Sequence, residues 1–169
     1  MQNKSKVIVT GLTASAAFFA ALIGFEGYES KPYLDTGKVA TIGIGSTVYE
    51  DGTKVKMTDK PITQKRAIEI SKAHVAKDEI AFRKSLTGVK LSQVEYDSYL
   101  DFTYNYGQGN WNGSSMLRNL KQGKYVAACE SLLKYKYVAK RDCSIRSNNC
   151  YGVWTRQKWR YDQCMGVNK

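Results

Sequence analysis

An uncharged segment, residues 7–25, follows a short polar stretch that carries Lys4 and Lys6. Small residues (Ala, Gly, Ser and Thr) outnumber large apolar residues within it. At about 1.5 Å per residue, a helix of this length reaches roughly 28 Å, just enough to span a hydrocarbon core of about 30 Å. Acidic residues begin at Glu26, so the positive-inside rule predicts a cytoplasmic N-terminus and export of residues 26–169.

Three interpretations of this segment compete: a cleaved signal peptide, a permanent membrane anchor and a core helix of a soluble protein. The small residues at 13–17 resemble a signal-peptidase site, and length and flanks alone favour cleavage. The segment by itself leaves all three interpretations open.

The hydrophobic pattern changes twice further along the chain. Residues 33–48 place β-branched residues between glycines, which predicts a hairpin with tight turns. Between Thr63 and Leu86, apolar residues recur at helical spacing among Lys and Glu, which predicts one long helix. The only histidine, His74, lies in that helix, and we assign it no catalytic role.

A run of helices is predicted after the long one. Ser92 and Glu95 form a capping box, and the helix that they open should run to about Tyr106 and stop at a turn-rich loop, residues 107–110. Shorter helices are predicted over residues 114–121, 125–135 and 153–165. A hairpin lobe, a long helix and a helical lobe make an α+β domain.

Composition and charge narrow the class of protein. Hydrophobic residues make up 43% of the 169 residues and aromatic residues 12%, enough to fill a core and to exclude a disordered chain. The 26 Lys and Arg against 15 Asp and Glu give a net charge of +11. Such an excess favours polyanionic partners, namely nucleic acid, anionic lipid or an acidic cell envelope, without choosing among them.

The four cysteines, Cys129, Cys143, Cys150 and Cys164, all lie near the C-terminal end. An even number of clustered cysteines in an exported chain predicts disulfides, with three possible pairings. We favour the nested pairing, Cys143 with Cys150 across a polar loop and Cys129 with Cys164 between two helices. Zinc is the rival, but there is no C-x-x-C and only one histidine, so we expect no metal site.

Two carboxylates lie where the uncharged segment meets the predicted hairpin. Glu26 ends the apolar run, Asp35 follows in a polar turn, and Thr41 begins the next strand. A protonated acid among apolar neighbours and an ionised partner are what glycoside hydrolysis requires. The spacing alone is weak, because a solvated acid and an ordinary turn aspartate would give the same pattern.

The string E-G-x4-P-Y-x-D-x5-T-I-G-I-G, which runs from Glu26 to Gly45, resembles the active-site signature of phage-type lysozymes, the T-even phage endolysin family (glycoside hydrolase family 24). Three further motifs match that family in chain order: F-x-x-N-x-G at 102–107, S-S-M-L-R at 114–118 and G-V-W-T-R at 152–156. The resemblance covers roughly residues 25–166. It implies the phage-lysozyme fold, with a small β-hairpin lobe, a long connecting helix and a helical C-terminal lobe.

The resemblance also implies an activity and the residues that carry it. Members of the family are muramidases, which hydrolyse the β-1,4 bond between N-acetylmuramic acid and N-acetylglucosamine in peptidoglycan, generally with inversion. By position, Glu26 matches the general acid, while Asp35 and Thr41 match the residues that position and activate the water. Asn105 matches a substrate-contacting position in the cleft, and Arg156 matches a basic residue close to the catalytic acid, where it would oppose loss of the acid's proton. We expect both to be substrate-binding residues. No cofactor is implied.

The resemblance changes the weighting of the N-terminal segment, because in this fold a helix leads directly into the catalytic Glu. Cleavage would remove the support of Glu26, so we expect residues 1–25 to be an uncleaved signal-anchor-release segment and residues 26–169 the lysozyme domain. The chain then resembles an endolysin of a lambdoid-like phage that passes the secretion translocon, is held in the host inner membrane by residues 7–25 facing the periplasm, and is released there. A phage holin would act indirectly, through the membrane potential.

Two rival functions are disfavoured. An inactive peptidoglycan-binding relative should have lost a catalytic residue, but Glu26, Asp35 and Thr41 are all present. A nucleic-acid-binding protein should show a recognisable binding module, and we expect neither nucleic acid nor a second subunit as partner.

Overall fold

The computed structural model describes residues 5–35 and 37–168, which form two compact units. The smaller unit comprises residues 14–79, and the larger unit comprises residues 5–13 together with residues 80–168. The long helix α2 (Gln64–Ser85) confirms the helix predicted between Thr63 and Leu86, and the chain passes from the smaller unit to the larger within it. The mixture of helices with small sheets confirms the predicted α+β class.

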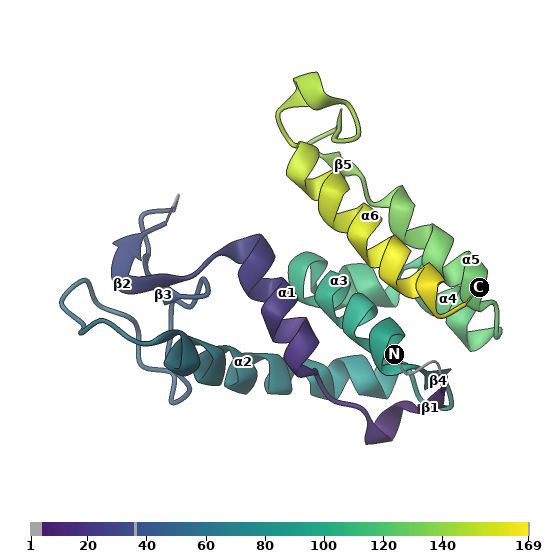
Figure 1. Ribbon diagram of the computed structural model, residues 1–169, viewed down its shortest axis with the longest axis horizontal. Helices are drawn as coiled ribbons and strands as arrows, with labels where there is room; N and C mark the ends of the chain where they lie inside the picture. The colour runs from purple at the N-terminus through teal and green to yellow at the C-terminus, as the bar shows by residue number, and fades with distance from the viewer. Residues whose placement is uncertain (1–4, 36, 169) are drawn as a thin grey trace. The chain divides into compact units, whose positions relative to one another are not determined.

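The smaller unit contains α1 (Ala16–Glu26), the hairpin of β2 (Glu29–Leu34) and β3 (Ala40–Gly43), and most of α2 (Figure 1). The strands are antiparallel, with Tyr33 opposite Thr41 and an irregularity before it. The hairpin predicted at 33–48 is therefore present but begins earlier, at Glu29. Its core is formed by apolar side chains from the helices and the hairpin region: Phe18, Phe19, Leu22, Ile42, Ile44, Val55, Ala67, Ile70 and Val75.

The segment at 7–25 differs from the expectation of one continuous helix. It forms strand β1 (Val7–Ile8), a 3-10 turn (Val9–Gly11) and only then α1. Consecutive β-branched residues favour the strand, and Ser15 caps the helix by accepting a hydrogen bond from the Phe18 N–H. No helix in the described ranges is both long enough and apolar enough to cross a bilayer.

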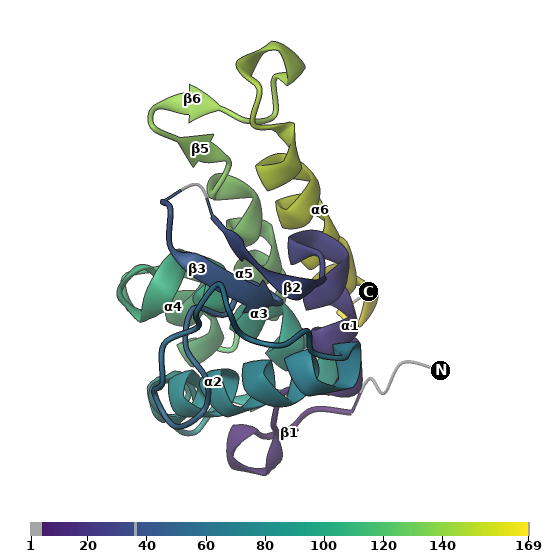
Figure 2. The same cartoon turned by 90° about the vertical axis from the view of Figure 1, so that its left-hand side faces the viewer.

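The larger unit is mainly helical. It holds β4 (Lys90–Leu91), which pairs with β1, and the helices α3 (Gln93–Asn112), α4 (Ser115–Lys121), α5 (Tyr125–Ser131) and α6 (Tyr151–Gly166). A 3-10 turn (Leu132–Lys134), the hairpin of β5 (Tyr137–Val138) and β6 (Arg141–Asp142), and a second turn (Arg146–Asn148) link α5 to α6 (Figure 2). The three shorter helices agree with their predicted positions to within a few residues.

Helix α3 confirms its predicted start and corrects its predicted end. Both hydrogen bonds of the Ser92–Glu95 capping box are present. The loop expected at 107–110 is instead helical: Gly107 adopts φ +84° and kinks the helix, which continues to Asn112. Burial of Trp111 accounts for the continuation, because its ring packs against those of Phe82 and Tyr99.

The cysteines form two disulfides, Cys129–Cys164 and Cys143–Cys150, which confirms the nested pairing. The first joins α5 to α6, and the second closes the loop before α6. Both lie within the larger unit, and they account for all four thiols that a zinc site would have used.

Candidate functional site

Glu26 is the last residue of α1 and is exposed. The helix ends there because Gly27 takes φ +82°, a conformation that glycine adopts at little cost, while its N–H still donates to the Ile23 carbonyl at 2.8 Å. Strand β2 begins three residues later, at Glu29. The chain thus places Glu26 at the junction between the apolar helix and the hairpin.

Asp35 and Thr41 are both tied to the main chain of Val39. The Val39 N–H donates to Asp35 Oδ1 at 2.8 Å, and the Thr41 hydroxyl donates to the Val39 carbonyl at 2.9 Å. Asp35 is half-buried in the turn of the hairpin, whereas Thr41 is only 2% exposed on β3. Because the Thr41 proton is committed to Val39, the lone pairs of its oxygen remain available as acceptors.

The Tyr33 phenol is close enough to several carboxylates for their charges to change its pKa. It lies opposite Thr41 in the sheet. Burial raises the pKa of its phenol above the usual value, and the negative charges of Glu29, Asp35 and Glu26 raise it further, in that order. The smaller unit therefore brings Glu26 and Asp35 within electrostatic reach of one ring.

Sequence reasoning quoted Tyr33 as part of the signature but gave it no role. The available signal was its position in the signature, two residues before Asp35.

Asn105, in the larger unit, is exposed on α3 shortly before the kink at Gly107. Its Oδ1 accepts a long hydrogen bond, 3.5 Å, from Arg160 Nη2. Because the carbonyl end faces the guanidinium, the amide nitrogen of Asn105 points away from it and can donate.

Arg156 belongs to a buried ion cluster on α3 and α6. It is 7% exposed and binds both carboxylate oxygens of Asp101, at 2.7 and 3.1 Å. Arg160 donates to the same carboxylate at 2.6 Å and is fully buried. Burial lowers the pKa of Arg160, although the Asp101 charge opposes that shift.

Sequence reasoning missed Asp101 and Arg160. Their helical spacing was a possible signal, since Arg160 follows Arg156 by one turn and Asp101 precedes Asn105 by one turn.

In the described part of the chain, no three His, Cys, Asp or Glu side chains lie close enough together to hold a metal ion. Three residues expected in catalysis, Glu26, Asp35 and Thr41, thus belong to the smaller unit, and the two expected in substrate binding, Asn105 and Arg156, belong to the larger unit.

Comparisons with known proteins agree on one family. The family model described as phage lysozyme matches residues 23–159. An endolysin of Salmonella phage P22 is 34% identical over 68% of this chain and 77% of its own length. A SAR-endolysin of Escherichia phage 933W is 30% identical over 96% of this chain and 92% of its own length. The solved structure of a P22 lysozyme mutant superposes with a TM-score of 0.78 at 28% identity, covering 91% of this chain and 99% of that one.

Proposed function

Because the chain belongs to the phage lysozyme family, we propose that Glu26 is its general acid and that Asp35 and Thr41 position and activate the attacking water. The protein is an endolysin: a glycoside hydrolase that cleaves the β-1,4 bond between N-acetylmuramic acid and N-acetylglucosamine in peptidoglycan and so lyses the host cell. Glu26 would protonate the leaving glycosidic oxygen. The water would attack from the opposite face of the sugar.

The shared anchor at Val39 is the observation that carries this proposal. Its N–H and carbonyl hold Asp35 and Thr41, so both acceptors are held by the main chain of one residue. A carboxylate and a hydroxyl oxygen held in this way can accept the two protons of one water molecule. Such a water suits an inverting reaction, in which acid and base stand far enough apart to admit it.

Substrate binding is the proposed role of Asn105 and Arg156. The exposed amide of Asn105 is oriented by Arg160 and can donate to a sugar oxygen. Arg156 would support the same surface by holding Asp101, the residue one turn before Asn105, through two hydrogen bonds.

Hydrolysis of purified cell walls tests the catalytic assignment. Glu26→Gln should lose activity by about 10² to 10⁴ or more with its fold intact, since general acid catalysis alone contributes that much. Glu29→Gln is the matched control, because Glu29 is exposed in the same unit and stands outside the signature. Near-normal lysis by the Glu26 variant would remove Glu26 from the mechanism. Retention of anomeric configuration in the first-formed sugar would overturn inversion.

Tyr33 offers a spectroscopic test of the geometry. Its pKa is raised in part by the charges of Asp35 and Glu26, so Asp35→Asn and Glu26→Gln should each lower it. Titration of the labelled Tyr33 ring by NMR measures the shift. Thr41→Val removes the acceptor without removing charge, and should impair hydrolysis while leaving this pKa nearly unchanged.

We also propose that residues 1–25 are an uncleaved signal-anchor-release segment. The family relatives named SAR-endolysin and the uncharged run at 7–25 between Lys6 and Glu26 support this. The fold adds support, because the described part of the segment belongs to both units: residues 5–13 to the larger and residues 14–25 to the smaller. Export would proceed through the secretion translocon to a form tethered in the inner membrane, and then to a periplasmic one.

In the tethered form both units would lack a part. The smaller would lack α1, which leads into Glu26, and the larger would lack β1 and Lys6. A misplacement of about 1 Å can cost about 100-fold in rate, so the tethered enzyme should be inactive. Release is favoured because burial of small side chains in lipid gains less free energy than burial of Leu does. Loss of the membrane potential on holin action would trigger it.

Two measurements test this proposal. Periplasmic protein should retain Met1 or its near neighbours, so N-terminal sequencing that starts after residue 15 would overturn retention. Replacing four small residues of the segment by Leu should trap the protein in the membrane and delay lysis: Gly11, Ala14, Ala17 and Ala20. Prompt lysis by that variant would overturn control by release.

A further inference from the structure

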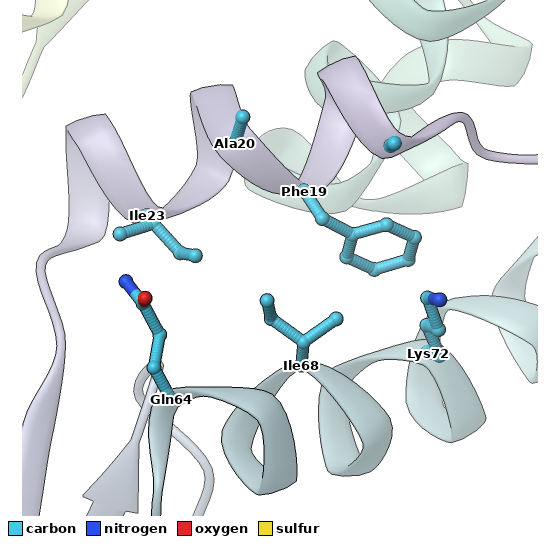
Figure 3. Close-up of a pocket in the computed structure, with 7 residues that line it drawn as sticks. Phe19, Ala20, Ile23, Gln64, Ile68 and Lys72 are labelled. Atoms are coloured by element: carbon cyan, nitrogen blue, oxygen red, sulfur yellow. The ribbon is translucent and has the colours of Figure 1, made fainter.

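A groove in the smaller unit lies between α1 and the first turns of α2 (Figure 3). Its volume is about 440 Å³, within the range of small-molecule sites. The lining residues come from both helices and are largely apolar: Ala16, Phe19, Ala20, Ile23, Gln64, Ile68 and Lys72. None of them takes part in the proposed chemistry, so the groove is a site separate from catalysis.

The groove exists because α1 is apolar on every face. No polar or charged side chain occurs between Ala16 and Phe25. The helix buries Phe18, Phe19 and Leu22, yet leaves Ala16 and Ala20 exposed along the groove. The side chains of Phe19 and Ile23 on α1 point toward Ile68 on α2 and leave a gap between the two helices (Figure 3). An elongated apolar gap of this kind fits an alkyl chain.

One end of the groove is positive. The Lys72 ammonium lies 5.6 Å from the centre of the Phe19 ring and is exposed, at the end opposite Gln64 and Ile23 (Figure 3). The first turn of α1, which also lies at this end, carries no acidic residue, and a helix N-terminus favours negative charge. Of the acids on α2, Glu69 pairs with Arg66, and Glu79 accepts from the Ala14 N–H, which places one carboxylate near the start of α1 and leaves Lys72 as the cation beside the groove.

From these features we infer that the groove binds a single-chain anionic amphiphile, of the fatty acid class, with its head group at Lys72 and its alkyl chain along Phe19, Ile23 and Ile68. The volume is enough for one alkyl chain. The bound chain covers apolar surface of α1 that is otherwise in water. Because it binds only when α1 is packed on α2, it stabilises the helix that ends at Glu26.

Calorimetric titration of the purified, released full-length protein tests this. Dodecanoate, kept below its micelle concentration, should bind with a stoichiometry of one and raise the thermal midpoint. From octanoate to dodecanoate each added methylene should tighten binding by up to about fourfold, as burial of one methylene predicts. Dodecyltrimethylammonium, with the same chain and the opposite charge, should bind at least tenfold more weakly.

Matched variants locate the site. Ala20→Leu fills the groove and should weaken dodecanoate at least tenfold, whereas Ala17→Leu adds the same side chain at an exposed position outside the lining and should not. Lys72→Met should abolish the preference for the carboxylate, and Lys65→Met, on an exposed residue of the same helix, should preserve it. Lys72 is exposed, so this pair remains informative if Ala20→Leu fails to fold.

Several outcomes would overturn the inference: equal binding by both alanine variants, no preference between the two head groups, or binding only to vesicles of two-chain phospholipid. The titration can be repeated in Glu26→Gln, where dodecanoate should bind as in the wild type. An error in the catalytic assignment would therefore not be mistaken for an error here.

Discussion

The two halves of the N-terminal segment are held in the fold by different forces. Residues 5–13 combine burial of Val9 and Leu12 in the larger unit with several specific polar contacts, whereas residues 14–26 are held in the smaller unit mainly by apolar burial. In the second half, α1 buries Phe18, Phe19 and Leu22, and polar contacts at its start come from the Ser15 cap and from the Ala14 N–H, which donates to Glu79. The apolar side chains of such a helix can be buried equally in a bilayer or in a protein core.

The first half needs particular partners. Lys6 forms an ion pair with the fully buried Glu95 and donates to Asn168 at 3.0 Å. The Val9 N–H donates to the Val89 carbonyl, and the Thr13 carbonyl accepts from Gln93 at 2.8 Å. No bilayer offers these groups, so the first half distinguishes the folded protein from the membrane, while the second half accepts both.

The largest expected effect is on the apolar half. Leu22 is fully buried, and Leu22→Ala should cost about 2–5 kcal/mol of stability, because it removes side-chain burial and leaves a cavity under α1. Hydrogen exchange should show the loss at the α1 amides. Wall hydrolysis should fall as well, since α1 carries Glu26.

Ile8→Ala is the control for that variant. Ile8 belongs to the same segment but is 54% exposed in β1, so its truncation should cost well under about 1 kcal/mol. If both substitutions cost the same, apolar burial does not distinguish the two halves.

Sequence alone predicts the features that rest on neighbouring residues. The capping box at Ser92 and the long helix α2 follow from local spacing and are confirmed, and the nested disulfide pairing, which we favoured among three, is confirmed as well. The division of the segment was not predictable, because the absence of charge from 7 to 25 says nothing of which partners residues 5–13 meet. The continuation of α3 past Gly107 was missed for the same reason, since Trp111 decides it by tertiary packing.

The candidate site divides in the same way. Glu26, Asp35 and Thr41 were found by a signature, and the structure places all three in one unit, while their roles stay predictions. The role of the Val39 main chain could not be predicted from the sequence, because nearly every residue has a backbone N–H and carbonyl. The Asp101–Arg156–Arg160 cluster forms because α3 packs against α6, and the spacing of residues within either helix does not predict that contact.

A smaller effect is expected at the polar half. Lys6→Met leaves Glu95 buried with hydrogen bonds from Ser92 and Asn168 but without its cation, which should cost about 1.5–3 kcal/mol. Exchange should quicken at the Val9 amide and stay unchanged in α1. The double variant with Glu95→Gln should cost less than the sum of the single changes, because the two residues form one pair.

Lys90→Met is the control, since Lys90 is exposed beside the same strand and has no ion pair among those described.

Glu95→Gln alone leaves the whole segment unchanged, so membrane insertion should be normal while docking of the released segment weakens. Lysis should then be slower without retention in the membrane. Unchanged stability in Lys6→Met would show that β-pairing, rather than the ion pair, holds this half.

The smallest effect is expected where the two halves meet. Ser15 accepts a hydrogen bond from the Phe18 N–H at 3.2 Å, and Ser15→Ala should cost about 1 kcal/mol, the usual value of a helix N-cap. Ser114→Ala, which removes the equivalent cap of α4, is the matched control in the larger unit. Each variant should quicken hydrogen exchange in the first turn of its own helix only.

Because Glu26 lies at the opposite end of α1, and buried Phe19 and Leu22 stand between, wall hydrolysis by Ser15→Ala should stay within about twofold of the wild type. A loss as large as that of Leu22→Ala would mean that α1 docks as a single cooperative unit, and that its cap, its packing and the position of Glu26 cannot be separated.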